Sequence, residues 1–480
     1  MTKNFLYTVL LSIVNILFPI LSFPYASRIL GPLGIGKVQF IISLAQYFAI
    51  FAALGIPIYG ITQAAKHKDD PKKLATVFVE LTGIFFIASI VLFAAYLAIV
   101  YSFTYFANNR ILYLYASSLI LLSFCYTDWF YAGIEKFKII TIRSVIVKIL
   151  ALVLLYLFVR TESDFGKYLF IIVFSILGNQ LFSFLMILRN TNFYFADINF
   201  KKHLKPLFYI FGATLASSIY TVLDTVLLGF FADHRAVGLY TSAVKLVKLT
   251  IPFVTAMGVI LIPSISNNFA KKNLREVRQL LTNSFHFLIL VSVPVCTGMA
   301  VLAPEFINAF SGSQFSEAAI SMQILSFLPL LIGLGHFFSY QILIPSGRNK
   351  EIFYSMLIGV FMSLLQNFIL VPMFHEKGAS VANVVTELMV TLSYFYFIKK
   401  HFDFSMDWKI LFQSSMAVLP FVPITLLVRQ ANLTAMITLF ISILACTFTY
   451  ITIHLYIFKN NFLFDFINPI KNKIFTDKLT

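Results

Sequence analysis

Residues 38–73 of this chain read VQFIISLAQYFAIFAALGIPIYGITQAAKHKDDPKK. The first part is an apolar run of about 20 residues, the length of helix that crosses the hydrocarbon core of a bilayer. The second part is a short polar gap that contains four lysines. Because positive residues concentrate in cytoplasmic loops, the stretch predicts a spanning helix whose C-terminal end faces the cytoplasm.

The same alternation continues along the whole chain and predicts an all-α membrane protein. Of its 480 residues, 59% are hydrophobic and 12% charged, which is more apolar surface than a soluble protein of this length can bury. We expect about fourteen transmembrane helices around a central cavity. The predicted spans are residues 5–25, 38–58, 77–101, 111–131, 140–160, 168–188, 207–230, 240–263, 283–303, 317–344, 352–374, 378–398, 409–428 and 433–457.

The distribution of positive charge predicts how the protein is oriented. With the N-terminus in the cytoplasm, 25 of the 36 Lys and Arg fall in cytoplasmic segments, 8 in outer segments and 3 within spans. We therefore predict a multi-pass protein of the bacterial inner membrane with both termini in the cytoplasm. The net charge of +16 is explained by loops beside anionic headgroups, so we expect no nucleic-acid partner.

A weak internal repeat divides the predicted spans into halves. ILGPLGIGKVQ at 29–39 follows the first span, and LLGFFADHRAVGL at 227–239 follows the seventh. Parallel repeats are a common plan of transporters, with the substrate site between the repeats. We predict two pseudo-symmetric six-helix lobes at 1–190 and 207–400, a cytoplasmic linker at 191–206, and two additional helices with a cytoplasmic tail at 401–480.

Charged residues inside the spans are the candidates for function. A charge at mid-membrane costs about 2.5–3.5 kcal/mol on insertion scales, so it faces a cavity or a partner. Lys245 and Lys248 are three residues apart and share one face of the eighth predicted span. We predict that they form a cationic outer chamber with Arg28 and Lys37, and that Asp224 is a partial counter-ion.

Three further charged residues extend this prediction. Arg143 and Lys148 add positive charge from the fifth span, toward the cytoplasmic side. Glu387, near the middle of its span, is a candidate for coupling or for charge compensation. The alternative interpretation is that the lysines snorkel to the interface and that Asp224 forms a structural pair with one of them.

Other residues receive a structural interpretation. We expect Glu80, near the cytoplasmic end of its helix, to snorkel to the interface. Asp128 precedes Trp129, an interfacial anchor type, so we expect it at the inner surface. Prolines within the spans predict helices that bend during gating or carry static kinks; they are Pro19, Pro24, Pro57, Pro252, Pro263, Pro294 and Pro329.

The sequence shows no sign of an enzyme. It contains no GxSxG, HExxH, P-loop or GxGxxG motif and no sizeable extramembrane domain. Cys125, Cys296 and Cys446 are far apart and belong to no Cys/His cluster. We therefore predict no catalytic residues, no metal, no disulfide framework and no cofactor. The choice between H⁺ and Na⁺ as a coupling ion stays open.

Three stretches resemble the Wzx-type flippases of bacterial polysaccharide biosynthesis, members of the multidrug/oligosaccharidyl-lipid/polysaccharide superfamily. They are FPYASRILGPLGIGKVQF at 23–40, DWFYAGIEKFKIITIRSVIVKIL at 128–150 and YTVLDTVLLGFFADHRAVGLYTSAVKL at 220–246. The resemblance implies alternating access of two lobes without ATP. It also implies a substrate: an undecaprenyl-diphosphate-linked oligosaccharide repeat unit of O-antigen, capsule or exopolysaccharide, moved from the cytoplasmic to the outer leaflet.

A diphosphate suits the predicted chamber, because Lys binds phosphate as a point charge and Arg as a bidentate fork. The implied partners are the lipid-linked oligosaccharide, membrane lipids, a polysaccharide polymerase and a chain-length regulator, and we expect a monomer. A multidrug cation antiporter of the same superfamily is the first alternative, although it would favour buried acids over buried lysines. A lipid II flippase is a closer alternative, because its substrate differs only in the headgroup. A membrane enzyme of glycan assembly, or a scaffold for such enzymes, ranks lower.

Overall fold

The computed structural model of the chain describes residues 2–191, 198–402, 406–460 and 462. Over these residues it contains helices and no strand. The chain forms two compact units, unit 1 (Met1–Thr241) and unit 2 (Ser242–Thr480). Part of the predicted linker (192–197) and the predicted tail lysines Lys471, Lys473 and Lys478 lie outside the described residues.

Unit 1 is built from α1 to α9, three short 3-10 helices and the start of α10. The bounds are α1 Thr2–Ala53, α2 Ile56–Lys66, α3 Pro71–Ser102, η1 Thr104–Asn109, α4 Arg110–Ala116, α5 Ser118–Leu121, η2 Ser123–Cys125, α6 Asp128–Gly133, α7 Phe137–Phe158, η3 Glu162–Asp164, α8 Phe165–Asn190 and α9 Lys201–Phe231.

Unit 2 contains the rest of α10 (His234–Lys248) and the helices that follow it. The bounds are α11 Ile251–Ala270, α12 Leu274–Val301, α13 Ala303–Ser311, η4 Ser313–Phe315, α14 Ala318–Leu325, α15 Leu328–His336, the π-helix η5 Phe337–Leu343, α16 Asn349–His401, α17 Trp408–Ala417, α18 Phe421–Gln430, α19 Ala435–Thr452 and the π-helix η6 Ile453–Ile457.

Many of these helices are long and apolar enough to cross a membrane. In the described part of the chain ten satisfy both criteria, or eleven if Thr104–Leu121 and Ser123–Gly133, bent by 42°, form one span. The prediction of an all-helical, multi-span membrane protein is therefore confirmed. Two of these helices, α1 and α16, each contain two of the fourteen predicted spans, and the predicted span at 207–230, in α9, is not among the ten.

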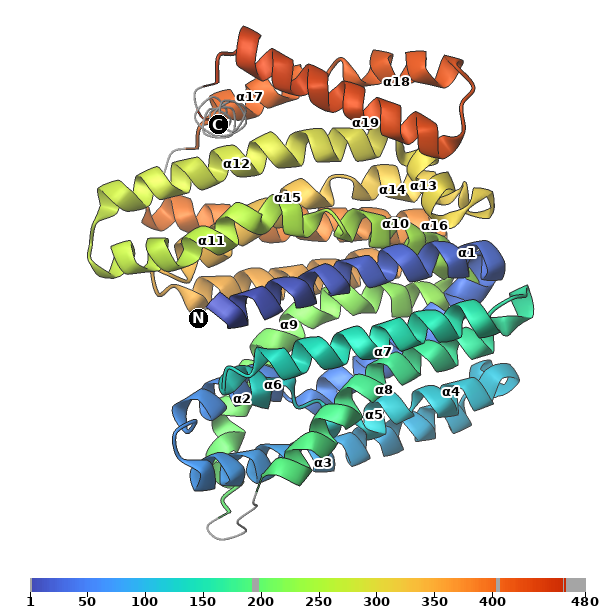
Figure 1. Cartoon of the computed structure of the whole chain (residues 1–480), viewed down its shortest axis with the longest axis vertical. Helices are drawn as coiled ribbons and strands as arrows, with labels where there is room; N and C mark the ends of the chain where they lie inside the picture. The colour runs from blue at the N-terminus through green and yellow to red at the C-terminus, as the bar shows by residue number, and fades with distance from the viewer. Residues whose placement is uncertain (1, 192–197, 403–405, 461, 463–480) are drawn as a thin grey trace, which may run out of the picture. The chain divides into compact units, whose positions relative to one another are not determined.

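The two long helices, α1 and α16, are both broken by one non-helical residue. At Gly31 the backbone turns with φ 63° and ψ 178°, a conformation that glycine adopts without steric cost, and Figure 1 shows α1 turning sharply. In α16 the break is at His375, with φ 52° and ψ −126°. Each break falls in a gap between predicted spans.

The prolines divide into two groups. Pro57, Pro252 and Pro329 stand in the first turns of α2, α11 and α15, so they start new helices instead of bending existing ones. The first turn tolerates proline because its N–H groups have no intrahelical partner. Each of the three follows a break inside a predicted span, at 38–58, 240–263 and 317–344. The other four, Pro19, Pro24, Pro263 and Pro294, lie inside helices.

The core of unit 1 gathers large aromatic side chains. Trp129 is 2% exposed and stacks on Phe78 with ring centroids 5.9 Å apart; Phe130 packs edge-on against the same ring. The prediction that Trp129 is an interfacial anchor was therefore wrong. Its indole is worth more as buried apolar surface here than at an interface.

In unit 2 the three C-terminal helices pack on α12. Figure 1 shows α17, α18 and α19 in red beside α12, and α19 also contacts α13. Buried residues of α11, α12, η5, α16 and α19, among them Phe285, Phe337 and Tyr450, form one apolar core. All three cysteines of the chain are buried, Cys125 in unit 1, and Cys296 and Cys446 in unit 2.

Candidate functional site

The two copies of the internal repeat meet inside unit 1. A Cβ atom at Gly36 would overlap the carbonyl oxygen of His234, and one at Gly238 would overlap that of Pro32. The contact is therefore reciprocal: the glycine of each motif receives the backbone of the other. Only glycine permits so close an approach of two helices. Sequence comparison of the motifs detected both segments but not their contact.

Two of the predicted headgroup residues lie close to this crossing. Lys37 is half-buried, its Nζ lies 4.9 Å from the centre of the Phe165 ring, and its charge acts on His234. Arg28 is exposed, and its Nη1 donates to the carbonyl oxygen of Pro24 one turn earlier, at 3.0 Å. Both cations therefore belong to the turn region of α1.

Asp224 is buried in α9 at 2% exposure. The hydroxyl of Tyr240 in α10 donates to its Oδ2 at 3.1 Å. A buried carboxylate needs such donors, because desolvation without them is costly. The hydroxyl group fixes the position of the carboxylate in unit 1, and tyrosine is a partner that the charge pattern of the sequence does not identify.

Arg143 of α7 has a different environment from that predicted. Its side chain is 3% exposed and its Nη2 lies 2.9 Å from Oδ1 of Asp128, while Nε donates to Oδ1 of Asn179 at 3.1 Å. Within the described residues Nη1 finds no acceptor. The guanidinium therefore links α6, α7 and α8, and Asp128 compensates its charge. Asp128 itself is only 25% exposed, held by this pair rather than presented at a surface.

Lys148, one and a half turns further along α7, contacts α1. Its Nζ donates to Oδ1 of Asn15 and lies 5.8 Å from the ring of Phe18. The side chain is half-buried. An amide oxygen and an aromatic face both stabilise an ammonium group without neutralising it. Lys148 therefore binds to α1 through a neutral amide and an aromatic ring.

The lysine pair of α10 lies in unit 2. Lys245 is half-buried and Lys248 is exposed. Lys248 is close enough to act electrostatically on Glu387 of α16, which is 7% exposed. One of the two lysines is therefore near an acid that lies 139 positions after Lys248 in the sequence.

Glu387 packs against a glycine of α15. A Cβ at Gly335 would lie 3.5 Å from Oε1 of Glu387 and 3.5 Å from Oγ1 of Thr391, whose hydroxyl donates to the carbonyl oxygen of Leu331 at 3.1 Å. The π-helix η5 follows this helix directly and carries Gln341, 2% exposed, whose Oε1 has no partner among the described residues. π-Helical turns occur frequently at functional sites. Sequence reasoning missed Gln341.

Glu80 of α3 does not snorkel. It is fully buried and binds both Lys202 and His203, which begin α9. The prediction for Glu80 was therefore wrong, because it considered only the depth of the residue in its own helix. Sequence reasoning missed His203. The one signal for it in the sequence is a single histidine among the lysines of 201–205 (KKHLK).

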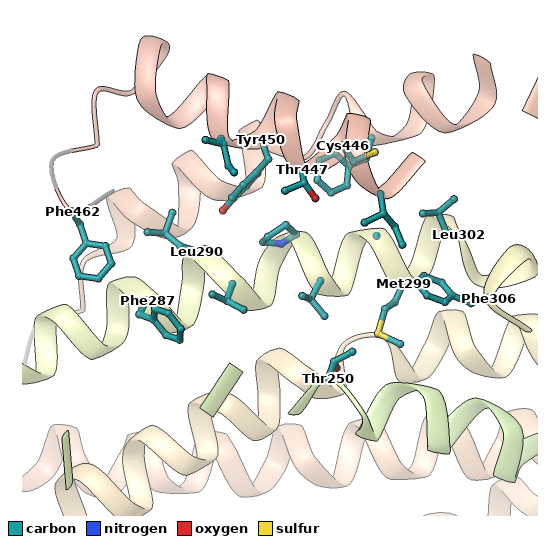
Figure 2. Close-up of a pocket in the computed structure, with 17 residues that line it drawn as sticks. Thr250, Phe287, Leu290, Met299, Leu302, Phe306, Cys446, Thr447, Tyr450 and Phe462 are labelled. Atoms are coloured by element: carbon teal, nitrogen blue, oxygen red, sulfur yellow. The ribbon is translucent and has the colours of Figure 1, made fainter. Parts of the chain in front are cut away.

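Unit 2 also contains an apolar cavity of about 480 Å³ between α12 and α19. Figure 2 shows Cys446, Thr447 and Tyr450 of α19 facing α12, which contributes Leu290 and Met299 to the opposite wall. Phe462 and Phe306 lie at its two ends. Such a lining fits a hydrocarbon chain and offers few polar groups to a sugar.

Across the described residues no three His, Cys, Asp or Glu side chains come together as ligands for a metal ion. Among these residues the polar groups are instead half-buried or exposed cations, buried acids in both units, and hydrogen-bonded networks. The arrangement suits binding and movement of a charged molecule.

The family model described as polysaccharide biosynthesis protein matches residues 1–269, more than half of the chain. The chain belongs to this family. A second model, MatE, matches residues 210–369. Polysaccharide biosynthesis proteins of this kind are transporters, so the chain is not an enzyme, as its sequence predicted.

Individual proteins agree with the family assignment. The chain is 24% identical over 407 residues to an Escherichia coli K12 protein whose provisional name is O-antigen transporter, covering 83% of this chain and 97% of that protein. It is 27% identical over 240 residues to the lipid II flippase MurJ of Bacillus subtilis, covering 47% of this chain and 44% of MurJ.

Solved structures share the fold of this polysaccharide biosynthesis protein. A lipid II flippase MurJ in an inward closed conformation superimposes with a TM-score of 0.74 at 15% identity, covering 95% of this chain and 99% of MurJ. An inward-facing multidrug MATE transporter of the MOP superfamily superimposes with a TM-score of 0.60 at 15% identity, covering 80% of this chain and 93% of that transporter. At this identity the likeness shows the fold alone.

Proposed function

We propose that this chain is a flippase for undecaprenyl-diphosphate-linked oligosaccharide repeat units of O-antigen, capsule or exopolysaccharide. It would carry them from the cytoplasmic to the outer leaflet of the bacterial inner membrane by alternating access. The observation that carries the proposal is the similarity to the E. coli O-antigen transporter homologue, which extends over 97% of that protein. Family membership over residues 1–269 supports the same substrate class.

The proposed topology has fourteen spans with both termini in the cytoplasm. This number follows if α1 and α16 each cross twice and the broken helices α4–α6, α10–α11, α14–η5 and α17–α18 each cross once, together with α3, α7, α8, α9, α12 and α19. A straight helix of 52 residues would be about 78 Å long, far more than a bilayer core of about 30 Å. The two six-helix lobes remain at 1–190 and 207–400 in this proposal.

The diphosphate is proposed to bind the cations. Lys37, Lys148 and Lys245 are half-buried cations on membrane helices, and exposed Arg28 and Lys248 accompany them. A partly desolvated ammonium binds phosphate more strongly than one in water, because the local dielectric constant is lower. Arg143 would contribute only in a conformation that separates it from Asp128. The coupling or counter-ion role is assigned to Asp224 and Glu387.

The polyprenyl chain can enter the cavity between α12 and α19. Its walls are formed by aliphatic and aromatic side chains from two helices, and burying a single CH₂ group contributes about 0.8 kcal/mol. A lipid with a long isoprenoid tail gains more from such a cavity than a compact drug cation does. The cavity therefore supports a lipid substrate over the cation-antiporter alternative.

The proposal is tested with the purified protein in lipid vesicles that contain undecaprenyl diphosphate carrying a fluorescent oligosaccharide. A membrane-impermeant quencher reports how fast the label changes leaflet. We expect Lys245→Gln with Lys248→Gln to slow this movement at least about tenfold, the loss of about 1.4 kcal/mol of binding to the moving headgroup. The matched control is Lys271→Gln with Lys272→Gln, two exposed lysines just after α11. Equal rates for the two double variants would overturn the headgroup assignment, and no movement in wild-type vesicles would overturn the function.

A lipid II flippase is the second candidate, because the fold matches MurJ over 95% of this chain. The same vesicles discriminate the two. Unlabelled lipid II should compete poorly with the fluorescent oligosaccharide lipid if the proposal is right. Competition at equal concentrations would favour the second candidate.

A further inference from the structure

A hydrogen-bonded chain of titratable side chains in unit 1 has no part in the headgroup assignment. Its centre is Glu80, which is 0% exposed. Oε1 of Glu80 accepts from the backbone N–H of Asn199 at 2.7 Å and from Nζ of Lys202 at 2.8 Å, and Oε2 lies 2.8 Å from Nε2 of His203. Three donors from one five-residue segment therefore converge on one carboxylate.

His203 extends the chain to a third helix. The imidazole is 2% exposed, and its Nδ1 lies 2.9 Å from the hydroxyl oxygen of Tyr59 in α2. The chain Tyr59–His203–Glu80 thus joins α2, α9 and α3. All three side chains are buried, and Lys202, whose side chain is 46% exposed, connects Glu80 to the solvent at this end of unit 1.

The segment that carries His203 is closely packed on α3. A Cβ at Gly83, one turn from Glu80, would lie 2.9 Å from Cε1 of Phe200. The ring of Phe200 therefore fills the space that a larger residue at position 83 would take. This contact and the three hydrogen bonds to Glu80 hold the imidazole in one place, as a site for a proton requires.

The imidazole can bind a proton without losing any of these contacts. In the neutral form Nε2–H donates to Glu80 and Nδ1 accepts from the Tyr59 hydroxyl. In the cationic form both nitrogens donate, and the hydroxyl oxygen of Tyr59 accepts because a tyrosine hydroxyl serves in either role. Glu80 behaves differently: a proton on its carboxyl group would displace one of the three donors.

Titratable and charged groups from three helices surround His203. Glu80 faces it from α3 and Tyr59 from α2, while Lys202, on its own helix, is bound to the same carboxylate. The helix α1 also packs against α9, and after Lys37 it has no charged residue; Tyr47 is its one titratable side chain there. The negative charge of Glu80 therefore directly offsets the charge of an imidazolium.

We propose that the Tyr59–His203–Glu80 chain is a proton-binding site, with His203 as the carrier of one proton, and that it couples movement of the lipid-linked substrate to H⁺. Binding transfers a proton from hydronium to Nδ1, which breaks one O–H bond of hydronium and forms one N–H bond, and release returns the proton to water. The coupling part rests on the proposed flippase function and identifies its ion. The proton-binding part stands on the geometry of unit 1.

The first test observes the proton directly. In protein labelled with ¹⁵N-histidine, the variant His203→Gln identifies the signal of His203 among the 8 histidines. We expect this signal to change reversibly from the doubly to the singly protonated form between about pH 5.5 and pH 8.5, around the ordinary range of histidine. Tyr59→Phe, which keeps the Glu80 contact, should leave the signal titrating. A His203 signal that keeps one form throughout would overturn the proposal.

The second test measures coupling in the vesicles described above. We expect the wild-type rate to change severalfold over the same pH range and His203→Gln to remove this dependence, because glutamine can bond to both neighbours but carries no extra proton. His67→Gln, a half-buried histidine of the neighbouring loop, is the matched control and should keep the wild-type profile. An unchanged profile in His203→Gln would overturn the coupling. A titrating His203 in a protein that moves no lipid at any pH would instead overturn the flippase function and leave the proton site standing.

Discussion

Unit 1 and unit 2 each bury a glutamate, and the two have opposite surroundings. Glu80 in unit 1 is fully enclosed and accepts three hydrogen bonds from the start of α9. Glu387 in unit 2 is 7% exposed, and within the described part of the chain no donor reaches its carboxylate; Lys248 acts on it through charge alone. A satisfied carboxylate stabilises the fold, whereas one without donors has capacity left for a proton, a cation or a moving substrate.

The same contrast extends to how the helices are joined. In unit 1 the reciprocal crossing of Gly36 and Gly238 brings backbone against backbone. In unit 2 the tight contact at Gly258 is made with the side chain of Gln341, whereas a Cβ at Gly378 would overlap backbone, the carbonyl oxygen of Leu370. A side chain can rotate away and a backbone cannot. The Gly36–Gly238 crossing is therefore more rigidly specified than the Gly258–Gln341 contact, which has more freedom to rearrange.

Replacing the glycines gives the largest expected difference. Gly36→Ala puts a methyl group onto the carbonyl oxygen of His234, so the helices must separate, and we expect a loss above about 4 kcal/mol or failure to fold. Gly258→Ala meets the Gln341 amide, which can turn, and should cost about 1–2 kcal/mol. Thermal unfolding of both variants in detergent measures the difference. Equal midpoints would break the comparison between the units.

Replacing the two glutamates should give the second-largest difference between the units. Glu80→Ala leaves His203, Lys202 and the Asn199 N–H without an acceptor in a buried site, and we expect it to cost about 3 kcal/mol. Glu387→Gln removes a carboxylate that has no donor among the described residues and should leave stability within about 1 kcal/mol of wild type. Its effect should appear in the flipping rate. A large fall in stability for Glu387→Gln would show that the carboxylate is structural after all.

The two arginine pairs give a smaller difference. Arg143 is 3% exposed and bonds to Asp128 and Asn179, whereas Arg429 of unit 2 is 34% exposed and bonds to Glu305 through Nε at 2.6 Å and Nη2 at 2.8 Å. We expect Arg143→Met to cost about 2 kcal/mol and Arg429→Met about 1 kcal/mol, because solvent screens the more exposed pair. Double-mutant cycles with Asp128→Asn and Glu305→Gln measure each pair. A stronger coupling at Arg429 would reverse the expected order.

The smallest expected effect concerns the helix caps. Asp70 accepts from the backbone N–H of Lys73 at 3.2 Å and starts α3; this bond, with the Lys73 side chain, holds the pKa of Asp70 below its usual value. A lowered pKa means that the cap stabilises the fold at neutral pH and loses this contribution as acid protonates it. Asp70→Asn should therefore flatten a small decrease of the unfolding midpoint between about pH 5 and pH 3. Asp407, which caps α17 in unit 2 and also bonds to His286, is the matched site.

Much of the fold could be predicted because a membrane imposes it locally. The gap between residues 25 and 38 contains the turn at Gly31, and the gap between 374 and 378 contains the break at His375. Both follow from the length of a span and from the residues next to it. The helical class and the transporter family followed from the same alternation and from three quoted motifs.

The partners of the buried charges could not be predicted in this way. Glu80 is bound by residues 119 to 123 positions away, and Trp129 is buried under Phe78, a contact between separate helices. The depth of Glu80 along its own helix and the residue type of Trp129 suggested a position at the membrane interface for these two residues. Only the packing of α3, α6 and α9 shows that protein encloses both side chains. The role of the α10 lysines as headgroup ligands stays a prediction.

The burial of every native sulfhydryl group has a practical consequence. Cys125, Cys296 and Cys446 are all enclosed, so maleimide reagents should modify the unaltered protein slowly. A single cysteine introduced on an exposed helix end would then react far ahead of this background. Access of a charged reagent from one side of a cell or vesicle could report the sidedness of each loop, without first rebuilding the chain to remove its own thiols.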